Sequence, residues 1–296
     1  MGAGLSLRWK MTMRFPWRTH DGENREAHAW RVENPRGVVA CIHGLSGSGE
    51  QFHPLPARLG RYSFYALDLR GQGSDPVVAR RGMTLDLETQ LLDIGRFIAA
   101  LRRAHEGRPI FLMGESMGAL LTTAYAARDT LPREAEIDGV VLSVPVVGLQ
   151  REVPRFLKTA LAFLARHFPK ARLSPSRFVN GKKIAPPLTR DTEYQESLRK
   201  KPHHLRGFSL GFLAELGELI DSSHRLAERL QRPALVLSAG KDCFVKPEQI
   251  SSWFDRIPSA DKTHRLYSDA YHLLWHDWDR EMVMSDIEEW LDARSR

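Results

Sequence analysis

One serine stands in the setting of an activated nucleophile. Residues 114–118 read G-E-S-M-G, directly after the short apolar run 109–114 and directly before an alanine-rich helical pattern at 117–128. In the pattern G-x-S-x-G, the two glycines permit a tight strand-to-helix turn that lifts the serine hydroxyl above a sheet. The N-terminus of the following helix favours negative charge at that point. We therefore predict that Ser116 is a nucleophile.

A serine nucleophile needs a base, and the chain offers twelve histidines. We select His272, which follows the strand-like stretch Thr263–Tyr267 and precedes the last helical pattern. This position lies at the carboxyl end of a strand, where α/β sheets assemble their sites. His276 is the alternative base. The two histidines share a helix face, but no Glu follows the first and no third ligand lies nearby, so we predict neither a metal nor a cofactor.

The acid that orients the base should lie on another loop at the same edge of the sheet. Asp242 comes just after the apolar run 233–239 and thirty residues before His272. It would hold the imidazole in the productive tautomer and stabilise the imidazolium. A loop-capping role is the other interpretation of Asp242. Asp269 is the alternative acid, although it stands only three residues from His272.

A tetrahedral intermediate also needs donors for its oxyanion. Residues 42–49 read I-H-G-L-S-G-S-G, a glycine-rich turn after a predicted strand. The backbone N–H groups of Leu45 and Met117 are the predicted donors. A phosphate-binding loop is the competing interpretation, but the dinucleotide fingerprint requires glycine where this chain has Phe52.

Strand-like and helical patterns alternate around these residues. Helical spacing is found at 85–104, 117–128 and 281–292. This alternation predicts an α/β sheet that is largely parallel. Two weaker strands, 12–17 and 27–33, are expected to form an antiparallel start. The apolar strand-like runs are 36–42, 63–69, 109–114, 137–144 and 233–239.

The strand rhythm is interrupted between residues 146 and 231. Two segments with apolar helical spacing, around 153–168 and 208–220, predict a helical cap over the strand ends. The core would then have two parts, 1–145 and 232–296. The two apolar faces are expected to rest on the sheet and to line an acyl pocket, and core packing is the other interpretation of each residue. Five wall residues are predicted: Phe156, Leu161, Phe208, Phe212 and Leu213.

Composition limits the other classes. The chain has 296 residues and a net charge of +7, with no interleaved aromatic and basic motif of the kind that binds nucleic acid. No apolar run reaches the ~18 residues of a membrane span, so we expect a cytoplasmic protein. Cys41 and Cys243 are too few for a disulfide framework. Residues 1–6 fit an N-myristoylation motif at Gly2, and an ordinary flexible start is the alternative.

These residues together resemble the α/β-hydrolase superfamily, and within it the serine hydrolases similar to monoglyceride lipases and lysophospholipases. The matching segments are His43-Gly44, 68–74 (D-L-R-G-Q-G-S), 114–118, 240–245 (G-K-D-C-F-V) and 270–274 (A-Y-H-L-L). The resemblance implies a mostly parallel eight-stranded sheet, flanked by helices and carrying a helical cap insertion. It also implies a triad of Ser116, Asp242 and His272, with oxyanion amides from Leu45 and Met117.

The implied function is a serine carboxylic-ester hydrolase that forms an acyl-enzyme on Ser116. Thioesterase, amidase and acyltransferase chemistry use the same residues, and a ligand-binding protein of low turnover is a further alternative. An aspartate nucleophile, as in dehalogenases and epoxide hydrolases, is not present. The chain departs from relatives by lacking the G-E-H-S run after Gly44 and by having Gln72 where histidine is usual.

The predicted substrate is a lipid or other ester with a medium or long acyl chain. Activity is expected to rise with pH around a pKa near 6.5, as His272 loses its proton. A basic stretch in the cap predicts transient contact with an anionic lipid interface, and an ordinary solvated surface is the other interpretation. Its residues are Arg177, Lys182, Lys183, Arg199, Lys200 and Lys201.

Overall fold

The computed structural model describes residues 13–151, 153–173, 187–205 and 207–295. Its centre is an eight-stranded sheet in the order β1-β2-β4-β3-β5-β6-β9-β10. The first two strands are antiparallel to their neighbours, and the other pairs are parallel. The predicted largely parallel sheet with an antiparallel start is confirmed. Its strands are β1 (Met13–Arg18), β2 (Asn24–Trp30), β3 (Gly37–Ile42), β4 (Tyr62–Leu67), β5 (Ile110–Glu115), β6 (Gly139–Ser143), β9 (Ala234–Ala239) and β10 (Lys262–Tyr267).

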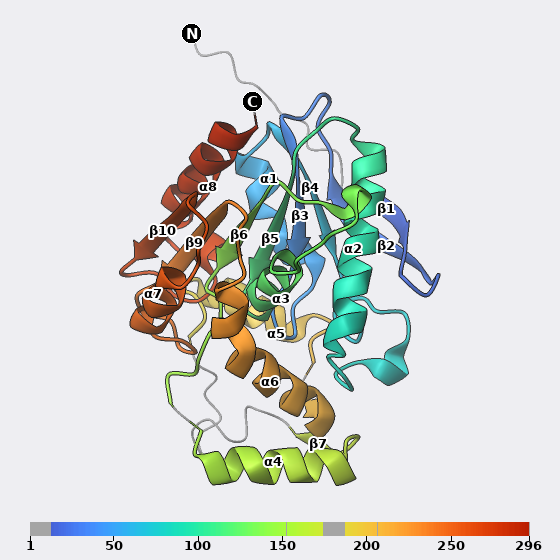
Figure 1. Ribbon diagram of the computed structural model, residues 1–296, viewed down its shortest axis with the longest axis vertical. Helices are drawn as coiled ribbons and strands as arrows, with labels where there is room; N and C mark the ends of the chain where they lie inside the picture. Colours follow the sequence, from blue (N-terminus) through green and yellow to red (C-terminus); the bar gives the residue numbers. More distant parts are fainter. Residues whose placement is uncertain (1–12, 152, 174–186, 206, 296) are drawn as a thin grey trace.

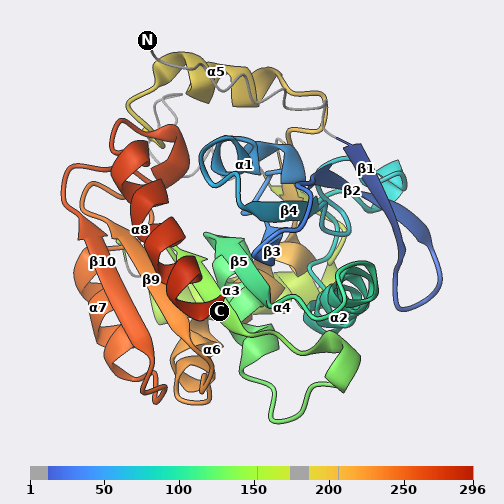
Figure 2. The ribbon, with the colours of Figure 1, turned by 90° about the horizontal axis from the view of Figure 1, so that it is seen from above.

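Helices cover both faces of this sheet, which is why its central strands are continuous apolar runs. One face packs against α2 (Leu87–Ala104), α3 (Met117–Ala126), α6 (Leu210–Ala227) and α7 (Pro247–Asp255). The other packs against α1 (Pro54–Arg58) and α8 (Arg280–Arg294), and Figure 2 shows the sheet between the two layers. Short 3₁₀ helices are η1 (Gly49–Phe52), η2 (Val78–Arg80), η3 (Arg133–Ala135) and η5 (Leu274–His276).

A helical segment separates β6 from β9 and lies at one end of the molecule, below the sheet in Figure 1. In order it contains α4 (Arg155–His167), β7 (Arg172–Leu173), α5 (Thr192–Lys200), β8 (Phe208–Ser209) and α6. The two short strands pair with each other, although no strand was expected here. Phe208 therefore lies in a strand and not in the predicted helix. A two-residue ladder is too short to leave a periodic pattern in the sequence.

Helix α4 lies in an outer layer. The expectation that it rests on the sheet is wrong: it packs against α6, because α6 already covers that part of the sheet. Ala165 is its one buried residue. Among the helices of the described ranges, none has both the length and the apolar character needed to cross a bilayer. Gly2 of the N-terminal motif lies outside the described residues.

Candidate active site

Ser116 occupies the turn between β5 and α3, with φ 59° and ψ −119°. Non-glycine residues rarely adopt a positive φ, and such strain occurs mostly at functional sites. The two flanking glycines allow this turn because no side chain would fit there. A Cβ on Gly114 would lie 2.3 Å from the carbonyl oxygen of Gly118, and a Cβ on Gly118 would lie 2.2 Å from that of Ile42. The motif therefore forms the predicted strand-to-helix turn.

His272 and Asp242 meet across two loops that follow β10 and β9. The Nδ1 atom of His272 lies 2.7 Å from Oδ2 of Asp242, and both side chains are buried. The other carboxylate oxygen, Oδ1, accepts hydrogen bonds from the backbone N–H groups of Phe244 (2.7 Å) and Val245 (3.3 Å). Asp242 is thereby fixed by its own loop. A carboxylate at Nδ1 holds the proton there and leaves Nε2 as the acceptor.

Opposing effects act on the pKa of His272. Burial lowers it, but the charge of Asp242 and the hydrogen bond to Asp242 raise it, and the net result is a raised pKa. The expectation of a value near 6.5 is therefore corrected upward. The physical reason is that the Asp242 carboxylate contacts the imidazole in a buried site and favours its charged form.

The two alternative residues lie elsewhere. His276 is buried, its Nε2 is 2.7 Å from the carbonyl oxygen of Gln51, and its ring stacks on Tyr194 with centroids 3.8 Å apart. Burial lowers the pKa of His276 to about 3. Asp269 is exposed and pairs with Lys241 at 2.9 Å. Neither residue contacts the Asp242–His272 pair through any of these interactions.

The turn after β3 lies against the nucleophile. A Cβ on Gly44 would lie 3.0 Å from Cβ of Ser116 and 3.2 Å from the carbonyl oxygen of Glu115. Leu45 follows this close contact. Met117 begins α3, where the first N–H groups have no acceptor within the helix. The predicted oxyanion donors therefore belong to the two turns that meet at Ser116.

Loop 68–74 supports the turn after β3, which carries the predicted oxyanion donor Leu45. The backbone N–H of Leu69 donates to Nε2 of the buried His43 at 3.1 Å. The side chain of Gln72 accepts from the N–H of Ser46 at 2.6 Å. Gln72 thus supports the turn directly. The predicted D-x-R-G segment is a scaffold for the turn that carries Leu45.

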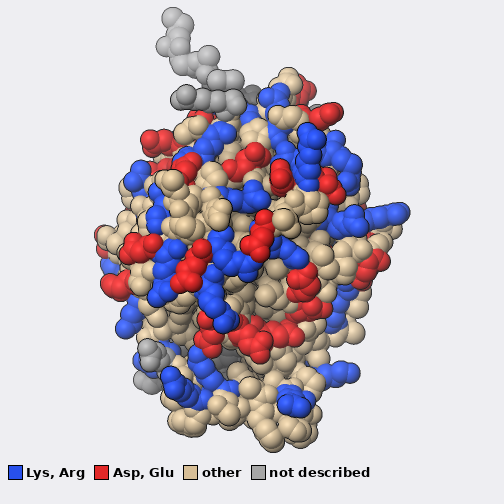
Figure 3. Space-filling view, in the orientation of Figure 1, with Lys and Arg blue, Asp and Glu red and all other residues tan. Residues whose placement is uncertain are grey.

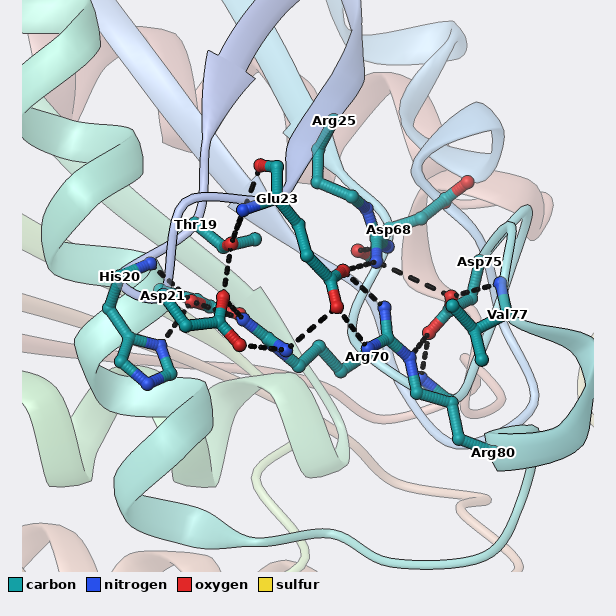
Figure 4. Close-up of polar contacts among 12 residues, drawn as sticks. Thr19, His20, Asp21, Glu23, Arg25, Asp68, Arg70, Asp75, Val77 and Arg80 are labelled. Carbon is teal, nitrogen blue, oxygen red and sulfur yellow. Dashed lines mark hydrogen bonds and ion pairs between the residues drawn. The ribbon is translucent and has the colours of Figure 1, made fainter.

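A network of ion pairs stabilises loop 68–74 (Figure 4). Arg70 pairs with Asp21 and with Asp93, and Arg80 pairs with Glu23 at 2.7 Å. The acidic groups of Asp21 and Asp93, together with His20, offer atoms close enough to hold a metal ion. The guanidinium of Arg70 already supplies the positive charge that these acids require. A cavity of about 270 Å³ beside the network is lined by none of Ser116, Asp242 or His272.

The sequence analysis missed Glu115. This residue is buried at the end of β5, and one of its carboxylate oxygens accepts a hydrogen bond from the side chain of Gln51. The other oxygen, Oε1, is buried without a hydrogen-bond partner among the described residues. Burial raises the pKa of Glu115 to about 8, although His272 opposes the shift. An ionisable residue directly after the apolar run 109–114 and next to Ser116 was the signal that could have identified it.

We expect Glu115→Gln to stabilise the protein increasingly as pH rises. Folded Glu115 keeps a proton between pH 4.5 and about 8 that unfolded Glu115 has released. The folded state binds more protons in this window, so the free energy of unfolding of the wild type falls as pH rises through it. Glutamine does not titrate and retains the contact with Gln51. Thermal melts of both proteins at pH 5 and pH 9 should show that the free energy of unfolding of Glu115→Gln exceeds that of the wild type by a few kcal/mol at pH 9 but not at pH 5. An equal difference at both pH values would contradict a buried neutral carboxyl.

The predicted wall residues are not gathered in one place. Phe208 and Phe212 are buried in the core, with ring centroids 4.7 Å apart, and Leu213 packs against the same core. Leu161 is half-buried on α4. Phe156 is 70% exposed and faces solvent. The predicted wall residues on β8 and α6 therefore pack into the protein core, whereas Phe156 on α4 lies on the outer surface.

Comparisons with known proteins agree with this architecture. Residues 33–279 match the family model described as serine aminopeptidase, S33. A phospholipase, YtpA, from Bacillus subtilis is 28% identical over 89% of this chain and 98% of its own length. A monoacylglycerol lipase from Mycolicibacterium smegmatis is 27% identical over 87% of this chain and 89% of its own.

Solved structures are similar over nearly the full length. The monoacylglycerol lipase of Paleococcus ferrophilus is 26% identical, with a TM-score of 0.75, over 96% of this chain and 100% of its own. A soluble variant of the monoglyceride lipase of Saccharomyces cerevisiae, in complex with a substrate analog, superimposes with a TM-score of 0.81. It is 22% identical and covers 100% of this chain and 99% of its own, so it supports the fold.

The fold and the strand-to-helix turn that carries Ser116 define a serine hydrolase of the α/β-hydrolase class. The chain belongs to the S33 family, whose model covers most of its length. It is similar to the monoglyceride lipases and phospholipases of that fold, and it is an enzyme of carboxylic-ester hydrolysis.

Proposed function

We propose that the protein hydrolyses single-chain lipid esters of the monoacylglycerol or lysophospholipid type, through an acyl-enzyme on Ser116. The observation that carries the proposal is the 2.7 Å contact between His272 and Asp242 beyond the strand ends, at the edge of the sheet where the strained turn presents Ser116. The Cys41 and Cys243 thiols are free, in keeping with a cytoplasmic location.

In the proposed reaction, Oγ of Ser116 attacks the ester carbonyl while Nε2 of His272 takes its proton. Asp242 stabilises the imidazolium that forms. The N–H groups of Leu45 and Met117 bind the oxyanion. His272 then protonates the leaving alcohol. Water, activated by the same histidine, attacks the acyl-enzyme and releases the acid and free Ser116.

The helical segment 146–231 is proposed to act as the cap that selects the acyl chain. Of the predicted wall residues, Leu213 on α6 and Leu161 on α4 are only partly buried and are the side chains proposed to contact the acyl chain. An apolar pocket gains about 0.8 kcal/mol for each methylene that it buries. We therefore expect kcat/KM to rise by up to about three orders of magnitude between p-nitrophenyl acetate and the octanoate, measured below micellar concentrations.

The same assay separates the remaining alternatives. It includes monooleoylglycerol, lysophosphatidylcholine, an acyl thioester and an aminoacyl p-nitroanilide. The last substrate tests the activity named by the family model, serine aminopeptidase. A preference for acetate over octanoate would exclude an acyl-selecting cap, and faster cleavage of the anilide than of every ester would exclude the lipid proposal.

We also propose that α4 contacts anionic lipid surfaces. Residues 153–173 contain no acidic side chain, and Arg155 and Arg166 are exposed there. The end of the molecule formed by α4 carries scattered basic groups among mostly uncharged residues in Figure 3. Exposed aromatic and basic groups on one amphipathic helix are typical of interfacial helices. Five large apolar side chains of α4 and its C-cap residue are 43–70% exposed: Phe156, Leu157, Phe163, Leu164 and Phe168.

The basic stretch of the cap contributes only in part to this surface. Arg199 and Lys200 are exposed at the end of α5. Lys201 is paired with Glu50 at 2.8 Å and is not available to a lipid headgroup. Arg177, Lys182 and Lys183 lie outside the described residues.

Vesicle flotation tests the α4 surface. Replacing Phe156 and Phe163 by serine should weaken binding to phosphatidylglycerol-containing vesicles at least about tenfold, because two exposed rings no longer insert. Hydrolysis of a monomeric ester should be unchanged. Leu266→Ser is the matched control, since Leu266 is 51% exposed on β10. Equal loss of binding in both variants would show that α4 is not the contact surface.

A further inference from the structure

The loop that carries His272 is held on both sides of the histidine. The N–H of Tyr271 donates to Oδ2 of Asp277 at 2.6 Å. The N–H of Leu273 donates to the carbonyl oxygen of Leu188 at 2.8 Å. Leu188 belongs to the helical segment between β6 and β9, and not to the sheet that forms the rest of the site.

Asp277 is the centre of these contacts and is fully buried. Its Oδ1 accepts from the backbone N–H of Arg190 at 3.0 Å, from Nε of Arg190 at 2.8 Å and from the N–H of Trp278 at 2.9 Å. Burial would raise the pKa of Asp277, but the hydrogen bonds from Arg190 and from the backbone hold it below its ordinary value. A buried carboxylate that loses its guanidinium partner is strongly destabilised in place.

Further contacts join the same two segments, and we call the whole set of contacts between residues 188–194 and residues 271–279 the clamp. The hydroxyl of Thr189 donates to the carbonyl oxygen of His276 at 2.6 Å. The ring of Tyr194 lies parallel to that of His276. Nη2 of Arg190 also donates to Asp279 at 2.7 Å. Residues 188–194 therefore contact the loop that carries His272 along its length from Tyr271 to Asp279.

We propose that Arg190 is a positioning residue for His272. Its guanidinium is engaged by Asp277 and Asp279, so its effect passes through Asp277 to the backbone of Tyr271 and from there to the neighbouring imidazole. The result is an imidazole held 2.7 Å from Asp242. This inference rests on the proposed role of His272 as the base. It makes the segment predicted as a substrate cap a part of the catalytic framework as well.

The test is the rate at which a fluorophosphonate probe labels Ser116, measured from pH 5 to 9 at a temperature where every variant is folded by circular dichroism. Arg190→Gln is expected to slow labelling by about 10²-fold, the typical cost of misplacing a reacting group by about 1 Å. The midpoint of the pH dependence should move to lower pH. The acidic groups that face His272 are Asp242 and Glu115, and a displaced loop weakens the contribution of Asp242.

Two matched variants complete the design. Arg190→Lys keeps a positive charge and should recover part of the rate. Arg229→Gln removes an exposed guanidinium that pairs with Asp129 at 2.9 Å and should label like the wild type. If Arg190→Gln does not fold, Thr189→Val is tested in its place. This change removes the hydrogen bond from Thr189 to the carbonyl oxygen of His276 at nearly constant side-chain volume. Slower labelling with a lower pH midpoint is then expected.

A purely structural role predicts a different result. It would lower the melting temperature of Arg190→Gln while leaving the labelling rate and the pH midpoint at their wild-type values, and that outcome would overturn the inference alone. If the wild type is not labelled at Ser116, or if His272→Ala is labelled as fast as the wild type, the proposed function fails together with the inference.

Discussion

Replacing Ser116 by alanine is expected to lower kcat for p-nitrophenyl octanoate by about 10⁶-fold, the loss typical of a removed triad nucleophile. The hydroxyl lies on a turn at the end of β5, and its removal leaves the close contacts between Gly114, Gly118 and the β3 backbone unchanged. The fold should therefore survive. Steady-state hydrolysis and a thermal melt on the same preparation give both results.

A second serine variant separates chemistry from general damage. Ser252 is exposed on α7, and Ser252→Ala should retain wild-type activity. Fluorophosphonate labelling should be lost in Ser116→Ala and kept in Ser252→Ala. If Ser116→Ala keeps more than about a tenth of wild-type kcat, Ser116 is not the nucleophile.

The nucleophile turn and the sheet could be predicted because their geometry restricts residue type. Only glycine fits at positions 114 and 118, where an added Cβ would collide with backbone. The central strands are buried on both faces, so each appears in the sequence as a short apolar run. Parallel strands place their carboxyl ends at one edge, which is why residues after β5, β9 and β10 were expected to meet.

The contacts that support the site could not be predicted in this way. Arg190 and Asp277 are 87 residues apart, and an arginine or aspartate in a polar stretch has the same appearance whether it is buried or exposed. The position of α4 was missed for a related reason. An amphipathic pattern predicts a helix with an apolar face, but it does not identify what covers that face, and here α6 leaves most of it open to solvent.

Replacing Asp242 by asparagine is expected to lower kcat by about 10⁴-fold with little change in fold. The amides of Phe244 and Val245 both donate to Oδ1, so the side-chain oxygen of the introduced asparagine should keep that position. Its NH₂ group then faces Nδ1 of His272. Since NH₂ is a donor, Nδ1 must accept, and the single proton of the neutral ring moves to Nε2. A protonated Nε2 cannot take the proton of Ser116.

The pH dependence of the surviving activity follows from the same contact. In the wild type, kcat/KM should rise with pH as His272 loses its proton, with a midpoint above 6.5, because the Asp242 carboxylate favours the charged imidazole. Asp242→Asn removes this negative charge, so the imidazole holds its proton less tightly and the midpoint should move to lower pH. Asp269→Asn changes an exposed acid paired with Lys241 and should leave rate and midpoint unchanged. A severe loss in Asp269→Asn with a mild one in Asp242→Asn would exchange the roles of the two acids.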